Sequence, residues 1–136
     1  MSLLAAGGAQ VFDPTWSARL NLERSDTGNL MRGESIAGLS QAVDLDALRA
    51  YRAAVCRRTR EVVPQLSDAD LHARVRPERL HRAVEEGAVR AEVSDLLAYW
   101  GGLTVAGLLA MPPTRHNFVH FNEAIRIKRK TELSCK

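Results

Sequence analysis

The longest nearly apolar run in the chain is LLAYWGGLTVAGLLAM, at residues 96–111. A helix that is apolar on all sides belongs in the centre of a core, so this segment is expected to be the central element of the fold. It is shorter than the roughly 20 residues that cross a bilayer, and no transmembrane span is expected. Gly101 and Gly102 predict a kink or the close approach of another backbone, because each glycine costs about 1 kcal/mol in a helix interior.

The helical pattern extends from this run in both directions. Residues 77–111 are helical in pattern throughout, with a polar first half and a nearly all-apolar second half. Pro112 and Pro113 break that pattern, because proline cannot continue a helix. A last helix is expected at about residues 114–130, with Thr114 as its N-cap.

Another helix is expected upstream, at residues 46–63. One of its faces repeats at steps of three or four residues and consists of Leu45, Leu48, Tyr51, Val55, Thr59 and Val62. Asp44 or Asp46 can cap its start, and Pro64 ends it. A short helix at residues 67–72 follows, because a serine with an acid three residues later is typical of a capping box.

Residues 4–41 are the least regular part of the chain. Residues 5–8 are two alanines followed by two glycines, which is typical of a helix end that runs into a turn. A chain that opens on a helix end is expected to lack a helix upstream. Residues 11–16 are expected to be a short irregular connection, and residues 25–29 a turn.

The composition predicts one soluble domain over residues 1–136, because 46% of the residues are apolar and 26% are charged. Alanine, leucine, arginine and glutamate dominate, which favours an all-α bundle of helices. The net charge is only +3, so no nucleic-acid partner is expected. The basic residues Arg126, Lys128, Arg129 and Lys130 suit the end of a solvated helix.

Cysteine usage and the N-terminus indicate the compartment. Cys56 and Cys135 do not make a disulfide framework, and the first six residues lack the basic and apolar regions of a signal peptide. A cytoplasmic location is therefore expected. Arginines beside Cys56 would lower the pKa of its thiol if they surrounded it in space, whereas a buried Cys56 would be inert; the second interpretation is favoured.

The most specific chemical feature is the stretch TRHNFVHFNE at residues 114–123. On a helix, His116, His120 and Glu123 project from one stripe. Two imidazoles at i and i+4 can hold one divalent cation, and Glu123 can ligate it, orient a water or act as a general base. Alternatively, the two histidines pack against neighbours and bond to backbone or to Asn117.

Other candidate residues carry weaker signals. His72 and His81 stand in polar, arginine-rich surroundings and are expected at the surface. Arg19, Arg24 and Asp26 are candidates to line a pocket for an acidic ligand.

Several segments between residue 4 and about residue 111 resemble the DinB/YfiT-like superfamily. They are residues 4–9, 12–16 and 19–20, the arginine-rich helix from residue 46, the turn at residues 66–71 and the apolar helix to residue 109. The resemblance implies an up-down-down-up four-helix bundle that lacks its N-terminal helices and carries an added C-terminal helix.

The resemblance also implies a function. Members of this family typically hold a divalent metal, often nickel or zinc, with one histidine of the second helix and two of the fourth. Better-understood relatives are transferases or isomerases that use low-molecular-weight thiols. In one register the paired histidines of the family fall near Asp95 and Tyr99, and His116 and His120 belong to an added helix. In the other register His116 and His120 occupy the family site, and residues 88–111 are an insertion.

Two hypotheses of function follow. The first is a metal-dependent enzyme with His116 and His120 as ligands, and with the missing ligand supplied by absent residues or by a second subunit. The second is a non-catalytic helical domain that forms a homodimer, because an incomplete bundle exposes a large apolar face.

Overall fold

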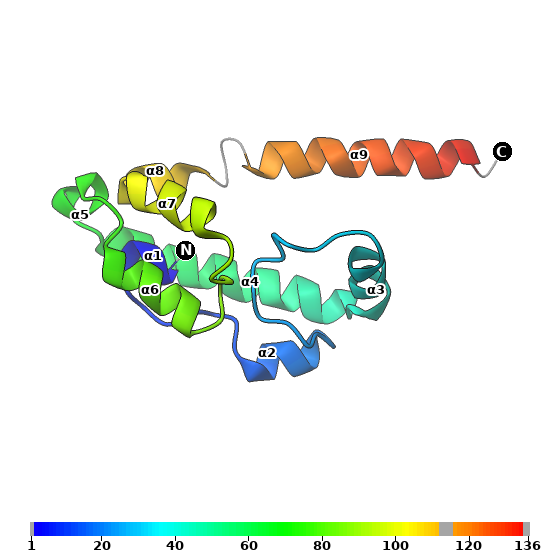
Figure 1. The fold of residues 1–136 in the computed structure, drawn as a ribbon, viewed down its shortest axis with the longest axis horizontal. Coiled ribbons are helices and arrows are strands. Elements are labelled where there is room, and N and C mark those ends of the chain that lie inside the picture. Colours follow the sequence, from blue (N-terminus) through cyan, green and yellow to red (C-terminus); the bar gives the residue numbers. More distant parts are fainter. Residues whose placement is uncertain (1, 112–115, 135–136) are drawn as a thin grey trace.

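The protein is all-α in the computed structural model, which describes residues 2–111 and 116–134 (Figure 1). The all-α prediction is confirmed for this part of the chain. The helices are α1 (Ser2–Ala6), α2 (Pro14–Arg19), α3 (Glu34–Ala42), α4 (Leu45–Val62) with a following 3-10 turn (Val63–Gln65), α5 (Asp68–His72), α6 (Pro77–Glu85), α7 (Ser94–Gly102), α8 (Val105–Met111) and α9 (Asn117–Ser134). None of the helices described here is long and apolar enough to span a membrane.

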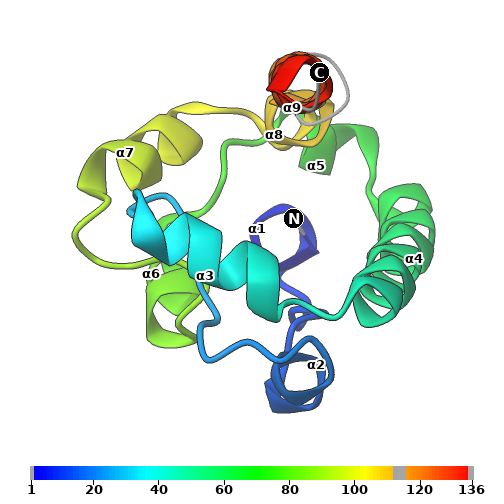
Figure 2. The same cartoon turned by 90° about the vertical axis from the view of Figure 1, so that its right-hand side faces the viewer.

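The centre of the fold is α1, which packs against α4, α6 and α8 (Figure 2). Leu3, Leu4 and Ala5 are all buried, and Leu3 and Leu4 belong to one cluster with Leu108 of α8. The expected helix end at residues 5–8 is confirmed, since α1 ends at Ala6. The prediction that residues 96–111 form the central helix is wrong, because a shorter segment occupies the middle of the core.

The region at residues 77–111 is three helices rather than one helical stretch. Gly87 has a φ of 68° and ends the first of them, since glycine adopts this left-handed conformation without strain. The break at residues 103–104 has a tertiary cause. The Val75 N–H donates to the Leu103 carbonyl at 3.1 Å, and the Val105 N–H donates to the Ala73 carbonyl at 2.9 Å. Backbone pairing with a distant segment therefore replaces helical hydrogen bonds here.

The glycine pair in α7 differs from the expectation. The helix ends at Gly102, so the glycine pair lies at a helix end rather than at the predicted kink within a helix. A Cβ atom built on Gly101 would lie 3.1 Å from Cδ1 of Leu80. The close neighbour of Gly101 is thus a side chain of α6 rather than another backbone.

The helices expected from local sequence signals are confirmed. The Asp44 side chain accepts from the Ala47 N–H and caps α4. Ser67 and Asp70 form the predicted capping box at the start of α5. Sequence patterns missed α2 and α3, although Asp13 and Pro14 are a typical N-cap and first residue of α2.

The last helix, α9, extends away from the other helices (Figure 1). It covers most of the predicted residues 114–130 and continues to Ser134, whereas the expected cap Thr114 lies outside the described residues. Several of its apolar side chains are more than half exposed, namely Phe118, Val119, Phe121 and Ile127. These four side chains therefore contribute little buried apolar surface to stabilise a helix of 18 residues.

Candidate functional site

The two histidines of the motif face each other at the start of α9. Nε2 of His116 and Nε2 of His120 are 3.2 Å apart, and the ring centroids are 4.6 Å apart. The helical spacing explains this, because residues four apart lie on the same face of a helix. Both side chains are exposed, so water and ions reach them directly.

The Glu123 carboxylate contacts Nδ1, the second ring nitrogen of His120. Oε2 of Glu123 is 2.9 Å from Nδ1 of His120. A carboxylate accepts hydrogen bonds only, so Nδ1 of His120 donates to Glu123, and Nε2 of the neutral ring accepts a hydrogen bond from Nε2–H of His116. His120 thus presents an unprotonated nitrogen toward His116, while Glu123 fixes the orientation of the ring.

The separation of the two nitrogens suits a metal ion. Two nitrogens bound to one zinc ion at about 2.0–2.1 Å, with a tetrahedral angle between them, are about 3.3 Å apart. The 3.2 Å between His116 and His120 is close to this value. A carboxylate on the far nitrogen of a ligating histidine is the usual outer-shell arrangement in metal sites. Glu123 is placed for this orienting role rather than as a third ligand on the same side.

The part of the chain that the structure describes does not present a complete set of metal ligands. Within residues 2–111 and 116–134, no group of three or more His, Cys, Asp or Glu side chains is arranged to hold a metal. A structural zinc site has four ligands and a catalytic one has three with an open position. In a metal site His116 and His120 would supply two ligands, and at least one more would have to come from outside this pair.

No family model matches the chain, and neither a curated protein nor a solved structure matches it. The resemblance to the DinB/YfiT-like superfamily thus stays a prediction, and function has to be argued from the geometry of this chain.

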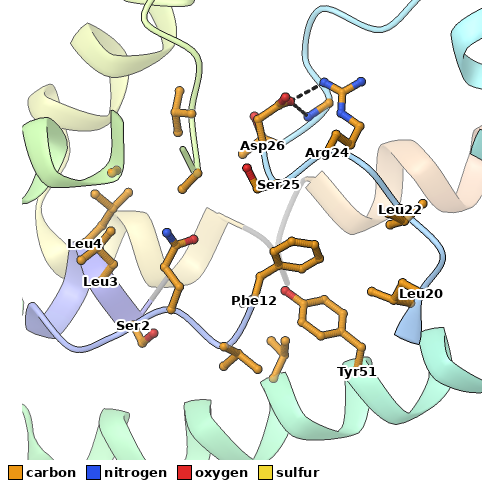
Figure 3. A pocket seen from close by; sticks show the side chains of 18 of the residues that line it. Ser2, Leu3, Leu4, Phe12, Leu20, Leu22, Arg24, Ser25, Asp26 and Tyr51 are labelled. Carbon is orange, nitrogen blue, oxygen red and sulfur yellow. Dashed lines mark hydrogen bonds and ion pairs between the residues drawn. The ribbon is translucent and has the colours of Figure 1, made fainter. Parts of the chain in front are cut away.

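A second feature is a cavity of about 460 Å³ that is partly open to solvent and is lined by residues of the N-terminal half of the chain, including α4, and of α6 and α7. Its walls are mainly apolar, and Tyr51 projects from α4 into it below the ring of Phe12 (Figure 3). The face of α4 that was expected from its periodicity provides one wall, through Leu48, Tyr51, Val55 and Thr59. The volume is within the range of small-molecule sites.

An ion pair lies at the edge of this cavity (Figure 3). Nη2 of Arg24 donates to Oδ1 of Asp26, and the Gly28 N–H donates to the same oxygen at 2.7 Å. Burial alone would raise the pKa of Asp26, but the hydrogen bonds from Gly28 and Arg24, with the charges of Arg24 and Arg90, outweigh it and lower that pKa below its ordinary value of 3.8. Asp26 is therefore ionised at neutral pH.

Asp26 is expected to make stability depend on pH. Because its pKa is lower in the folded state than in the unfolded chain, its contribution is fully present above about pH 4 and is lost as the pH falls through the lowered value. We expect Asp26→Asn to reduce the free energy of unfolding by about 1–3 kcal/mol at pH 7. In urea denaturation, the difference between the two proteins should shrink below about pH 4. A difference that is constant down to pH 2 would contradict this assignment.

Arg24 and Asp26 line the cavity, as expected from the sequence, but Arg19 does not. The Arg19 guanidinium lies 4.2 Å from the centre of the Trp16 ring, and Trp16 packs edge-on against Tyr51 behind the cavity wall. The expectation of an acidic ligand stays a prediction, and Asp26 already provides one anion that pairs with Arg24.

Three other sequence expectations concern isolated side chains. Cys56 is exposed, so the favoured prediction of a buried thiol is wrong; α4 turns its Tyr51 and Val55 face toward the cavity and Cys56 toward solvent. His72 and His81 are exposed, as predicted. Cys135 lies outside the described residues.

Proposed function

We propose that this protein is a divalent-metal-dependent enzyme that acts with a low-molecular-weight thiol, as a transferase or an isomerase. The observation that carries the metal part is the 3.2 Å distance between the Nε2 atoms of His116 and His120. The resemblance to DinB/YfiT-like proteins supplies the thiol part and the up-down-down-up arrangement of helices. Both parts are open to direct test.

The residues present suit nickel or zinc. Both ions accept imidazole nitrogen, which His116 and His120 offer from one exposed face. Such an ion, when bound, lowers the pKa of a coordinated thiol so that the thiolate forms near neutral pH. The Glu123 carboxylate contacts Nδ1 of His120 and so orients the ring.

A second copy of the chain is the proposed source of the missing ligands. Two copies of the His116–His120 pair would provide four nitrogens, the number that a closed zinc site requires. The surface area is consistent with association, because the chain exposes 9740 Å². A compact monomer of this mass would expose about 7,000 Å². The proposal is therefore a homodimer joined through the histidine face of α9.

Elemental analysis of the purified, tag-free protein tests the proposal. The protein is supplied with nickel and zinc, dialysed exhaustively and compared with a His116→Ala, His120→Ala variant. We expect one metal ion per chain or per dimer in the native protein and none in the variant. The absence of metal from both samples would reject the proposal.

A second candidate function is a non-catalytic helical domain that forms a dimer through an apolar face of α9. Phe118 and Phe121 are each 65% exposed, and helical geometry places them about 60° apart on one face. That face lies on the other side of the helix from His120. Exposed aromatic side chains in such an arrangement favour association between chains.

The two candidates predict different responses of the oligomer. If the histidine face joins the chains, a chelator should convert the dimer to a monomer in light scattering, and Phe121→Glu should have little effect. If the aromatic face joins them, Phe121→Glu should give a monomer and the chelator should not. Ile127→Glu is a control for the aromatic face alone, since Ile127 is 64% exposed and lies about 180° around the helix from Phe118, on the side of His116 and His120. A monomer under all conditions would reject both dimers.

A further inference from the structure

The long helix α4 carries an excess of positive charge. It contains five arginines and only two acidic residues, so its formal charge is +3. The net charge of the whole chain is also +3, so the charged residues outside α4 balance. The low net charge predicted no nucleic-acid partner, but a total over the chain does not show where the charge lies.

Three arginines of α4 have no acidic partner, namely Arg52, Arg57 and Arg60. Both acidic residues of the helix pair with its other two arginines, each three residues away. Arg52, Arg57 and Arg60 are exposed, and their side chains form no ion pair and no hydrogen bond with any residue that the structure describes. A guanidinium group cannot lose its proton in a protein, so three permanent positive charges face solvent. We call these three residues the arginine face.

The arginine face is a row along the outside of the helix. At 100° per residue its members lie within about 140° of one another, and the first and last are about 12 Å apart along the axis. Tyr51 and Val55 line the cavity, so the arginine face is on a different side of α4. The helix itself forms one side of the molecule (Figure 2). A large partner can therefore reach all three charges at once.

A row of fixed cations suits the backbone of a nucleic-acid duplex. Duplex DNA carries one negative charge for about every 1.7 Å of its axis, so several phosphates fall within the length of the arginine face. The planar guanidinium group donates two parallel hydrogen bonds to one phosphate. Contacts of this kind hold the backbone without reading the bases.

The residues between the arginines disfavour two other partners. Residues 49–60 are all described by the structure, and none of their large apolar or aromatic side chains is exposed. Helices that lie on a membrane bury apolar side chains in it, and proteins that hold single strands stack the bases on aromatic side chains. The arginine face offers neither kind of contact, so a duplex fits it better than a lipid surface or a single strand.

We propose that the arginine face of α4 binds the phosphate backbone of duplex DNA without sequence preference. The surface contains no residue of the histidine pair of α9. It therefore stands or falls independently of the proposed metal-dependent function.

Fluorescence anisotropy with a labelled DNA duplex of about 20 base pairs tests the proposal on the full chain. A chelator in the buffer keeps metal bound to His116 and His120 out of the measurement. Three phosphate contacts predict that the affinity falls about 500-fold when the salt concentration rises tenfold, from about 20 to about 200 mM. A second duplex of unrelated sequence should bind equally well.

A triple variant locates the surface. Replacing the whole arginine face (Arg52→Gln, Arg57→Gln, Arg60→Gln) is expected to weaken binding at least about 20-fold at the lowest salt concentration and to remove most of the salt dependence. All three side chains are exposed, so the variant should fold, and circular dichroism checks this.

The matched control removes the same charge from other exposed positions. It carries Arg32→Gln, Arg126→Gln and Arg129→Gln, and we expect it to weaken binding less than about threefold. An equal loss in the two triple variants would mean that only the net charge matters, and it would overturn the proposal.

Four other outcomes would also overturn it. They are no binding at the lowest salt concentration, binding that does not respond to salt, tighter binding of a single strand of the same length, and equal binding of polyglutamate or of phosphatidylserine vesicles. Equal binding of polyglutamate would mean that the arginine face attracts any polyanion. Equal binding of the vesicles would mean that it does not distinguish DNA from an anionic lipid surface.

Discussion

Replacing His120 with alanine is expected to weaken zinc binding at least about 100-fold. The variant loses one of the two nitrogens that lie 3.2 Å apart, and a single exposed imidazole does not retain a metal ion through dialysis. His120 also carries the contact to Glu123, so its loss removes the oriented ring as well. Competition titration with a zinc-binding dye measures the change.

Two further variants show whether the loss belongs to the proposed site. Glu123→Gln keeps both imidazoles but removes the carboxylate from Nδ1 of His120, and we expect a smaller loss of about 10–100-fold. His81→Ala removes an exposed histidine from α6 and should change nothing. If His81→Ala weakened binding as much as His120→Ala, the zinc would be held by scattered surface histidines and the proposed site would be wrong.

The largest expected effect on stability comes from Leu108→Ala. Leu108 of α8 is 0% exposed and packs in the cluster that contains Leu3 and Trp100. Removing its side chain loses buried apolar contacts and leaves a cavity, which typically costs about 2–5 kcal/mol. Urea denaturation at pH 7 gives the change in the free energy of unfolding.

Leu45→Ala is the matched control for that measurement. Leu45 is the first residue of α4 and is 61% exposed, although its periodicity resembles that of the buried residues of the helix. We expect its substitution to change the free energy of unfolding by less than about 0.5 kcal/mol. A loss below about 0.5 kcal/mol for Leu108→Ala as well would contradict the placement of Leu108 in the core.

The sequence by itself determined the elements that depend on near neighbours. The start of α4 at Asp44 and the capping box of Ser67 and Asp70 form within a few residues, so local chemistry is sufficient to predict them. The facing of His116 and His120 is of the same kind, because four residues of helix bring any such pair together. The same spacing does not predict which further residues would complete a metal site.

Only the tertiary structure decided which distant segments meet. The helical run at residues 96–111 is interrupted because the backbones of Leu103 and Val105 form hydrogen bonds with the backbone near Val75. No local sequence pattern predicts that contact. The short helix α1 became the centre of the core because three larger helices pack around it.

The cavity also depends on tertiary structure. Arg24 and Asp26 gave a weak signal as a pair, but Trp100 and Tyr51 looked like ordinary apolar residues of two helices. They line one cavity only because the fold brings α4 and α7 to the same space. Periodicity reports which face of a helix is apolar, whereas packing determines what that face surrounds.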